Sequence, residues 1–233
     1  MRILGLIPAR GGSKGIPRKN IKLLHGKELI KYSIEIGLKT DFIAEVMVST
    51  DDEEIANISK SAGARIPFLR PSHLADDNAA TIDTVIHLLE FLEKRNDLFD
   101  AVCLLQPTVP FRNLSDLELA IQKFIDTDAD SLISVREVPH IYNPNWVYEE
   151  EDKTGFLKLA KGTERIISRR QDLPKAFHRD GSFYLTKKEI IRKEKSLYGK
   201  KIKYHILEDS PNINIDTMKD WEAAVNYAKS NFK

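Results

Sequence analysis

The chain of 233 residues is long enough to bury a sizeable core as one large domain. Its 36 basic and 35 acidic residues nearly cancel, which argues against a nucleic-acid-binding protein that relies on bulk positive charge. No apolar run approaches the ~20 residues of a membrane span, and the start "MRILGLIPAR" lacks the pattern of a secretory signal, so we expect no membrane partner. The only cysteine, Cys103, rules out an intramolecular disulfide and predicts a cytoplasmic protein.

Short apolar runs alternate with longer amphipathic patterns over the first part of the chain. The short runs predict strands buried on both faces, at residues 2–7, 45–50, 101–106 and 131–136. Apolar residues three and four apart predict helices at residues 27–40, 51–63, 80–95 and 115–127, the last with a capping box of Ser115 and Glu118. This alternation predicts an α/β fold, with a mostly parallel sheet and helices on both faces.

The alternation stops near residue 137. Residues 137–175 are rich in Pro, Gly, aromatic and charged residues, and we expect hairpin-like strands and long loops that project from the core. The α/β pattern then resumes with strands at 182–186 and 202–207 and a closing helix at 217–231. We therefore predict a single domain over 1–233 that contains the extension 137–175.

The first loop, "IPARGGSKGIPRKN" (7–20), carries most of the local charge. Residues 1–27 hold seven Lys or Arg and no acidic residue. Glycines let backbone N–H groups approach an anion, and Lys and Arg add charge, so the loop is typical of a phosphate site. It matches neither the Walker nor the dinucleotide-binding pattern of glycines. Because the loop follows the first strand, we favour a triphosphate site over a solvated basic turn.

Three later segments add polar residues. Residues 69–81 contain Arg70 and the small-residue turn "NAAT", preceded by Asp76 and Asp77, which we expect to be helix caps. Gln106 falls at the end of the third predicted strand. The segment "SRRQDLPKAFHRDGSFY" offers the side chains of Arg169, Arg170, His178, Arg179 and Tyr184.

The segment "NINID" (212–216) is a candidate metal site. In an extended segment, Asn214 and Asp216 point to the same side. Two oxygen ligands at this spacing suit Mg²⁺, which takes its other ligands from water and phosphate. The alternative is that Asp216 is only the N-cap of the closing helix.

The motifs together resemble one family. "IPARGGSKGIPRKN", "VSTDDEEIA", "LRPSHLADDNAAT", "LLQPTVPFR", "RRQDLPKAF…DGSFY" and "INIDT" occur in the same order as in the CMP-sialic acid synthetases, or acylneuraminate cytidylyltransferases. The resemblance implies a Rossmann-like α/β domain of the nucleotidyltransferase type. It also implies an enzyme that uses CTP and Mg²⁺ to attach CMP to the anomeric oxygen of a nine-carbon 3-deoxy-2-keto sugar acid, releasing pyrophosphate. Family members usually form homodimers through a projecting arm, which 137–175 resembles.

The resemblance also assigns roles to individual residues. Those implied to bind CTP are Arg10, Ser13, Lys19, Asn20, Arg70, Ala79 and Thr81. Those implied to contact the sugar acid are Gln106, Arg170, Arg179 and Tyr184. Arg170, Arg10 and Lys19 are the implied catalytic residues, and Asp216 and Asn214 the implied metal ligands. Two positions depart from the family pattern: Asn214 stands where several bacterial members have Asp, and His178 follows Phe177 where some have Arg.

Other functions stay open at this point. A related nucleotidyltransferase could act on 3-deoxy-octulosonate or on a sugar or polyol phosphate. The neutral Asn214 also leaves open a nucleotide-binding protein without catalysis. The sequence identifies neither the particular nonulosonic acid nor a general base.

Overall fold

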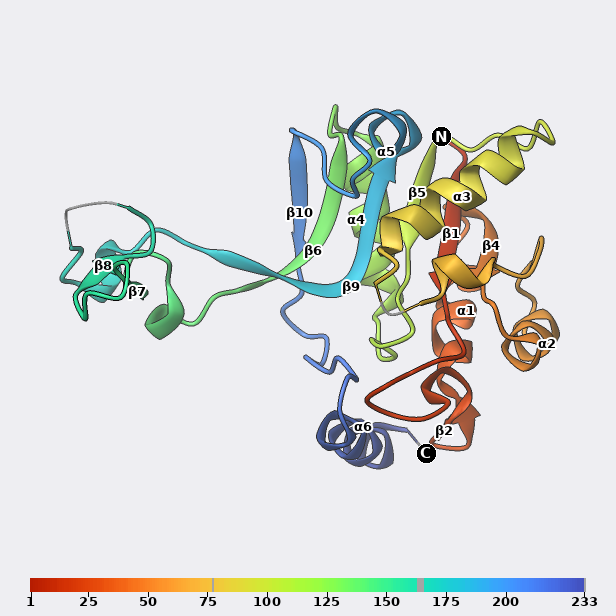
Figure 1. Ribbon diagram of the computed structural model, residues 1–233, viewed down its shortest axis with the longest axis horizontal. Coiled ribbons are helices and arrows are strands. Elements are labelled where there is room, and N and C mark those ends of the chain that lie inside the picture. The colour runs from red at the N-terminus through yellow and green to blue at the C-terminus, as the bar shows by residue number, and fades with distance from the viewer. Residues whose placement is uncertain (77, 163–165, 233) are drawn as a thin grey trace. The chain divides into compact units, whose positions relative to one another are not determined.

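The computed structural model describes residues 1–76, 78–162 and 166–232, and Asp77 therefore lies outside the described residues (Figure 1). The chain divides into two compact units. The first comprises Met1–Ser134 with Gly181–Lys233, and the second Val135–Asp180. Among the described helices, none has both the length and the apolar character needed to cross a membrane.

The first unit is built on a six-stranded sheet. Its strand order is β10 (Ile202–Ile206), β6 (Ser131–Glu137), β9 (Phe177–Lys187), β5 (Ala101–Leu104), β1 (Ile3–Pro8) and β4 (Ile43–Ser49). β1 pairs in parallel with both β4 and β5, while β9 runs antiparallel to β5. The predicted strands and the mostly parallel sheet are confirmed. The antiparallel direction of β9 was not predicted, because strand direction is decided by the connection and not by a local pattern.

Helices cover both faces of the sheet. Successive side chains of a strand point to opposite faces, and those of β1 are apolar on both faces. Ile3 and Ile7 face a core formed with α1 (Leu29–Lys39), α2 (Glu53–Ser61) and α4 (Leu114–Ile125). Leu4 and Leu6 face a second core formed with α3 (Thr81–Glu93) and α5 (Lys188–Glu194). The expected helices on both faces are therefore confirmed.

The closing helix, α6 (Met218–Asn231), packs apart from these two cores. Its Trp221, Ala224 and Ala228 bury against Ile16 of the first loop and Leu24 of the short antiparallel pair β2 (Leu23–Leu24) and β3 (Lys27–Glu28). Burial of these apolar side chains fixes α6 beside the first loop. The residues just before α6 are thereby held close to that loop.

The predicted capping box of Ser115 and Glu118 is wrong. α4 begins one residue earlier, and the Asn113 side chain caps it by accepting a hydrogen bond from Ser115 N at 2.8 Å. A capping box occurs instead at α6, between Thr217 and Asp220. Both sites carry an N-cap residue type, so composition alone did not decide which residue caps the helix.

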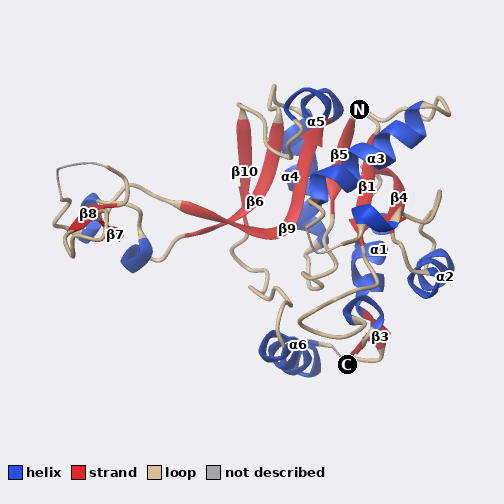
Figure 2. Ribbon diagram, viewed as in Figure 1, coloured by secondary structure: helices blue, strands red, loops and turns tan. Residues whose placement is uncertain are grey.

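The second unit contains the antiparallel hairpin of β7 (Tyr148–Glu150) and β8 (Leu157–Leu159), with 3-10 turns at His140–Tyr142 and Arg170–Asp172 (Figure 2). The expected hairpin is confirmed. Trp146 Nε1 donates to the carbonyl of Ile167 at 2.5 Å, which ties the segment before β7 to the chain at Ile167. Several large apolar side chains stay exposed, namely Ile141, Tyr142, Phe156, Leu157 and Ile166.

Candidate functional site

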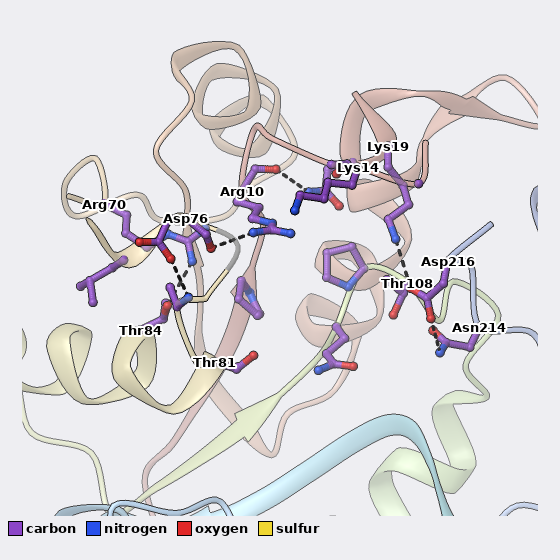
Figure 3. A pocket seen from close by; sticks show the side chains of 18 residues that line it. Arg10, Lys14, Lys19, Arg70, Asp76, Thr81, Thr84, Thr108, Asn214 and Asp216 are labelled. Atoms are coloured by element: carbon purple, nitrogen blue, oxygen red, sulfur yellow. Dashed lines mark hydrogen bonds and ion pairs between the residues drawn. The ribbon is translucent and has the colours of Figure 1, made fainter. Parts of the chain in front are cut away.

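A cavity of about 460 Å³ opens at the carboxyl ends of the parallel strands of the first unit. Ligands of open α/β sheets bind at this edge, where the connecting loops meet. Its walls come from the loop after β1, the segment before α3, the turn after β5 and the segment before α6 (Figure 3). The lining residues are Pro8, Arg10, Ser13, Lys14, Gly15, Lys19, Asn20, Arg70, Leu74, Asp76, Ala79, Thr81, Thr84, Gln106, Pro107, Thr108, Asn214 and Asp216.

Hydrogen bonds of cavity-lining side chains fix the conformation of the first loop. The buried Asn20 donates through Nδ2 to the carbonyl of Arg10 at 2.9 Å, which closes the loop on itself. Arg10 Nη1 donates in turn to the carbonyl of Asp76 at 2.7 Å. The Asp76 carboxylate accepts from Asn78 N and Ala79 N at 2.9 and 2.7 Å. Asp76 therefore caps the turn before α3 and not the helix itself, whose N-cap is Ala80.

Acidic residues after β4 hold the same loop from outside. Gly11 N donates to Asp51 Oδ1 at 3.0 Å, and Arg18 pairs with Asp52 and Glu54. The hydrogen bond from Arg18 is the main reason that the pKa of Asp52 is lowered and the pKa of Arg18 raised. Arg18 thus neutralises surface carboxylates, and Arg10, Lys14 and Lys19 are the cations of the first loop that line the cavity.

The segment before α6 is fastened to the loop by Lys19. Lys19 Nζ donates to the carbonyl of Ile215 at 2.7 Å and lies 3.3 Å from Asp216 Oδ1. Ile215 N donates to the carbonyl of Thr108 at 2.8 Å, so the turn after β5 joins the same contact. Asn214 Nδ2 donates to Asp216 Oδ2 at 3.0 Å, which places both side chains on one side of the segment, as predicted.

Asp216 is not the N-cap of α6, because Thr217 and Asp220 form that cap. Its carboxylate is 62% exposed and lines the cavity. Within the described ranges, no group of three or more His, Cys, Asp or Glu side chains is placed to hold a metal. One carboxylate and one amide fit a hard cation such as Mg²⁺ only when a triphosphate and water supply the other ligands.

Arg70 is the most unusual charged residue of the cavity. Only 7% of it is exposed, and Nη1 donates to Thr84 Oγ1 at 3.0 Å. Nε and Nη2 are buried and have no hydrogen-bond partner among the residues that the structure describes. Burial lowers the pKa of Arg70, against the opposing charge of Asp51. Buried donors without partners are costly, so these two N–H groups indicate a ligand that accepts from both.

The structure brings most of the predicted site residues into this one cavity. They are Arg10, Ser13, Lys19, Asn20, Arg70, Ala79, Thr81, Gln106, Asn214 and Asp216. Tyr184 instead lies in the core on the α3 face, opposite Leu104 of β5. Arg170 and Arg179 belong to the second unit, where Arg170 lines a separate cavity of about 310 Å³. The roles of these three residues at the sugar acid stay predictions.

Sequence reasoning missed several lining residues. Thr84 follows Thr81 by one helical turn, and this spacing would have indicated that both face the cavity. Lys14 lies inside the quoted loop, and Thr108 inside "LLQPT". The sequence around Gly15 did not indicate that a glycine is required there, because the atom that excludes a side chain belongs to a distant part of the chain. A Cβ atom at Gly15 would lie 2.2 Å from the carbonyl oxygen of Asp216.

The parallel strand ends, the basic loop and the buried arginine together define a nucleotide-binding α/β protein of the nucleotidyltransferase type. Sequence comparison specifies the family: residues 4–230 match the family model described as "Cytidylyltransferase". The chain belongs to this cytidylyltransferase family and, within it, to the CMP-sialic acid synthetase type.

Three known proteins illustrate the likeness. A pseudaminic acid cytidylyltransferase from Campylobacter jejuni is 36% identical over 224 residues, covering 96% of this chain and 95% of that protein. A CMP-N,N'-diacetyllegionaminic acid synthase from Legionella pneumophila is 36% identical over 222 residues, covering 95% and 94%. A CMP:2-keto-3-deoxy-manno-octonic acid synthetase, solved in complex with CTP, has a TM-score of 0.75 over the full length of both chains. At 16% identity, this last likeness shows the fold alone.

The close approach at Gly15 leads to a stability prediction. Gly15→Ala should force the first loop away from the carbonyl of Asp216 and lower the free energy of unfolding by about 1–3 kcal/mol, the usual cost of overpacking. Gly12→Ala is the matched control, because a Cβ atom there meets no atom of the described residues within 4 Å. Chemical denaturation of both variants measures the difference. Equal stability of Gly15→Ala and Gly12→Ala would contradict the close approach.

Proposed function

We propose that the protein joins CMP from CTP to the anomeric hydroxyl of a nonulosonic acid and releases pyrophosphate. The family supports the nucleotidyl transfer, and relatives named for pseudaminic and legionaminic acids support a nonulosonic acid over 3-deoxy-octulosonate. The single observation that carries the nucleotide choice is Arg70, whose Nε and Nη2 are buried and have no hydrogen-bond partner among the described residues. The lone buried cysteine, Cys103, is consistent with a cytoplasmic location.

Arg70 suits cytosine better than uracil. The ring nitrogen N3 and the carbonyl oxygen O2 of cytosine are adjacent acceptors, and a guanidinium presents adjacent donors in a fixed fork. Uracil carries a hydrogen on N3 and would set a donor against a donor. Ala79 also lines the cavity, and its small side chain would leave room for a flat ring. Thr84 lines the same end of the cavity as Arg70 (Figure 3).

The triphosphate then extends toward the opposite wall. Arg10 and Lys14 lie between Arg70 at one end of the cavity and Asp216 at the other (Figure 3). In the reaction, the sugar hydroxyl oxygen forms a bond to the α-phosphorus, and the bond between that phosphorus and the bridging oxygen to the β-phosphorus breaks. Pyrophosphate leaves with the electron pair of that bond, and the hydroxyl proton passes to solvent water. Arg10 and Lys19 would hold the phosphates in line and offset the charge on the leaving group.

Asp216 and Asn214 are the residues that would hold Mg²⁺. When bound, the cation would neutralise part of the triphosphate charge. Lys19 holds Asp216 at the cavity wall in the protein alone, so a cation would compete with the ammonium group for this carboxylate. The exposed, cavity-facing carboxylate favours a working enzyme over a nucleotide-binding protein without catalysis.

The sugar acid needs a cation for its carboxylate. We propose that Arg170 or Arg179 of the second unit provides it, that Gln106 contacts the sugar from the cavity, and that Tyr184 contributes at the end of β5. This assignment rests on the family motifs "RRQ" and "DGSFY". The wild-type chain should release pyrophosphate with CTP and a nine-carbon nonulosonic acid faster than with 3-deoxy-octulosonate.

Nucleotide selectivity tests the role of Arg70. Arg70→Met should lower kcat/KM for CTP by about 10–100-fold, since a hydrogen bond to a charged group contributes roughly 1.5–3 kcal/mol. The preference for CTP over UTP should shrink by a similar factor. Arg95→Met, which removes an arginine outside the cavity, is the control and should keep both values. Pyrophosphate release with CTP, UTP, ATP and GTP measures them, and an unchanged CTP preference in Arg70→Met would count against cytosine binding at Arg70.

A magnesium titration tests the metal site. Asp216→Asn should severely reduce Mg²⁺-dependent turnover, because it removes the formal charge of the site. Asn214→Asp should stay active and need less Mg²⁺ for half-maximal rate, since carboxylates suit this hard cation. Glu222→Gln removes an exposed carboxylate of α6 and is the control. If Asp216→Asn follows the wild-type titration curve at saturating CTP, the metal binds elsewhere.

The exposed apolar side chains of the second unit lead us to propose a homodimer. Tyr142, Val147 and Phe156 are exposed, as predicted for residues that a second copy covers. Trp146, which we expected in the same group, is only half-buried and is held within the unit by Ile167. Leu157, the first residue of β8 in the hairpin of this unit, is 67% exposed.

Light scattering tests the dimer. Leu157→Asp should produce monomers, because it places a charge in the proposed interface. Leu119→Asp is the control: Leu119 is 59% exposed on α4, in the first unit, and its replacement should leave the dimer intact. A wild-type chain that is monomeric and fully active at assay concentration would refute the proposal.

A further inference from the structure

Asp51 lies just beyond the end of β4 and contacts two parts of the site at once. Its Oδ1 atom accepts a hydrogen bond from Gly11 N at 3.0 Å, next to Arg10 of the first loop. The same oxygen lies 3.9 Å from Arg70 Nη2. Asp51 is not among the described residues that line the cavity. Its influence on the cavity therefore passes through Gly11 and Arg70.

The backbone keeps Asp51 and Arg70 together. Arg70 N donates to the carbonyl of Thr50 at 2.7 Å, which holds the chain around Arg70 against the end of β4. Ala9 N donates to the carbonyl of Ser49 at 2.9 Å and holds the start of the first loop against the same strand end. The position of the Asp51 carboxylate between Gly11 and Arg70 is thus set by main-chain contacts on both sides.

The negative charge of Asp51 stabilises the buried guanidinium of Arg70. Arg70 is almost fully buried, and burial lowers the pKa of its guanidinium, as does the nearby positive charge of Arg10. Asp51 supplies the negative charge that opposes both effects. Removing one partner of a buried charge pair leaves the other uncompensated, which is costly. Without the Asp51 charge, the buried position of the Arg70 guanidinium would be disfavoured.

We propose that Asp51 is a positioning residue that couples the triphosphate loop to the base-binding arginine. The proposal rests on the proposed function, in which Arg70 binds cytosine and the loop binds phosphate. The neighbouring Asp52 has a different task, since it caps α2 through Ile55 N at 3.0 Å and pairs with Arg18 outside the cavity. Asp52→Asn therefore serves as the matched control for Asp51→Asn.

Two replacements separate the two contacts of Asp51. Asp51→Asn keeps an oxygen that accepts from Gly11 N but removes the charge that faces Arg70. Asp51→Ala removes both. The effect of the charge is the difference between wild type and Asp51→Asn, and the effect of the acceptor is the difference between Asp51→Asn and Asp51→Ala.

The experiment is an NMR titration of the full-length chain with cytidine, which reports on the base end, and with tripolyphosphate, which reports on the loop. Asp51→Asn should weaken cytidine binding about tenfold, equal to about 1.4 kcal/mol. Its tripolyphosphate binding should be unchanged or tighter, because a negative charge is lost. Asp51→Ala should bind tripolyphosphate about fivefold more weakly than Asp51→Asn. Asp52→Asn should match wild type with cytidine.

A double-mutant cycle distinguishes positioning from a general loss of structure. If Asp51 acts through Arg70, Asp51→Asn should have no further effect on cytidine binding in the Arg70→Met background. Wild-type affinity of Asp51→Asn for cytidine, or an equal loss in both backgrounds, would overturn the proposal. Failure of wild type to prefer cytidine over uridine would instead refute the base assignment of the proposed function. The tripolyphosphate difference between Asp51→Asn and Asp51→Ala would still test the loop contact.

Discussion

The contact of Lys19 with the chain at residues 215–216 is the interaction on which the cavity depends. It joins the loop after the first strand to a segment almost two hundred residues later, through the carbonyl of Ile215 at 2.7 Å and the carboxylate of Asp216 at 3.3 Å. Gly15 allows the two segments to touch, since any side chain there would meet the carbonyl of Asp216. The burial of Trp221 against Ile16 also holds the first loop against the segment before α6. Without it the cavity would lose the wall that carries Asp216 and Asn214.

The cations of the first loop have separate tasks, although the sequence groups them together. Arg18 faces outward and is neutralised by Asp52 and Glu54, so it holds the loop in place. Arg10, Lys14 and Lys19 line the cavity. A loop that is already held by hydrogen bonds on both sides loses little conformational entropy when it binds an anion. In the proposed function, these cations act on the triphosphate without first ordering the loop.

The sequence predicted the parts of the molecule that depend on local patterns. The strands, the helices and their two-sided packing follow from residue periodicity, and the phosphate loop follows from its glycines and cations. The antiparallel direction of β9, the cap at Asn113 and the exposure of Asp216 depend on contacts between distant residues, which no single segment contains. The same reason explains why Thr84 and Asp51 were missed: each acts through Arg70, from a different part of the chain. The motif resemblance supplied what periodicity could not, namely the nucleotide and the class of acceptor.

We propose that CTP lies across one cavity, with its base at Arg70 and its phosphates along the first loop toward Asp216. A crystal structure of the chain with CTP tests this most directly. We expect Nε and Nη2 of Arg70 to donate to N3 and O2 of cytosine, and the triphosphate to contact Arg10 and Lys14. A complex in which the base lies beside Asp216, or in which Nε and Nη2 of Arg70 still lack a partner, would contradict it.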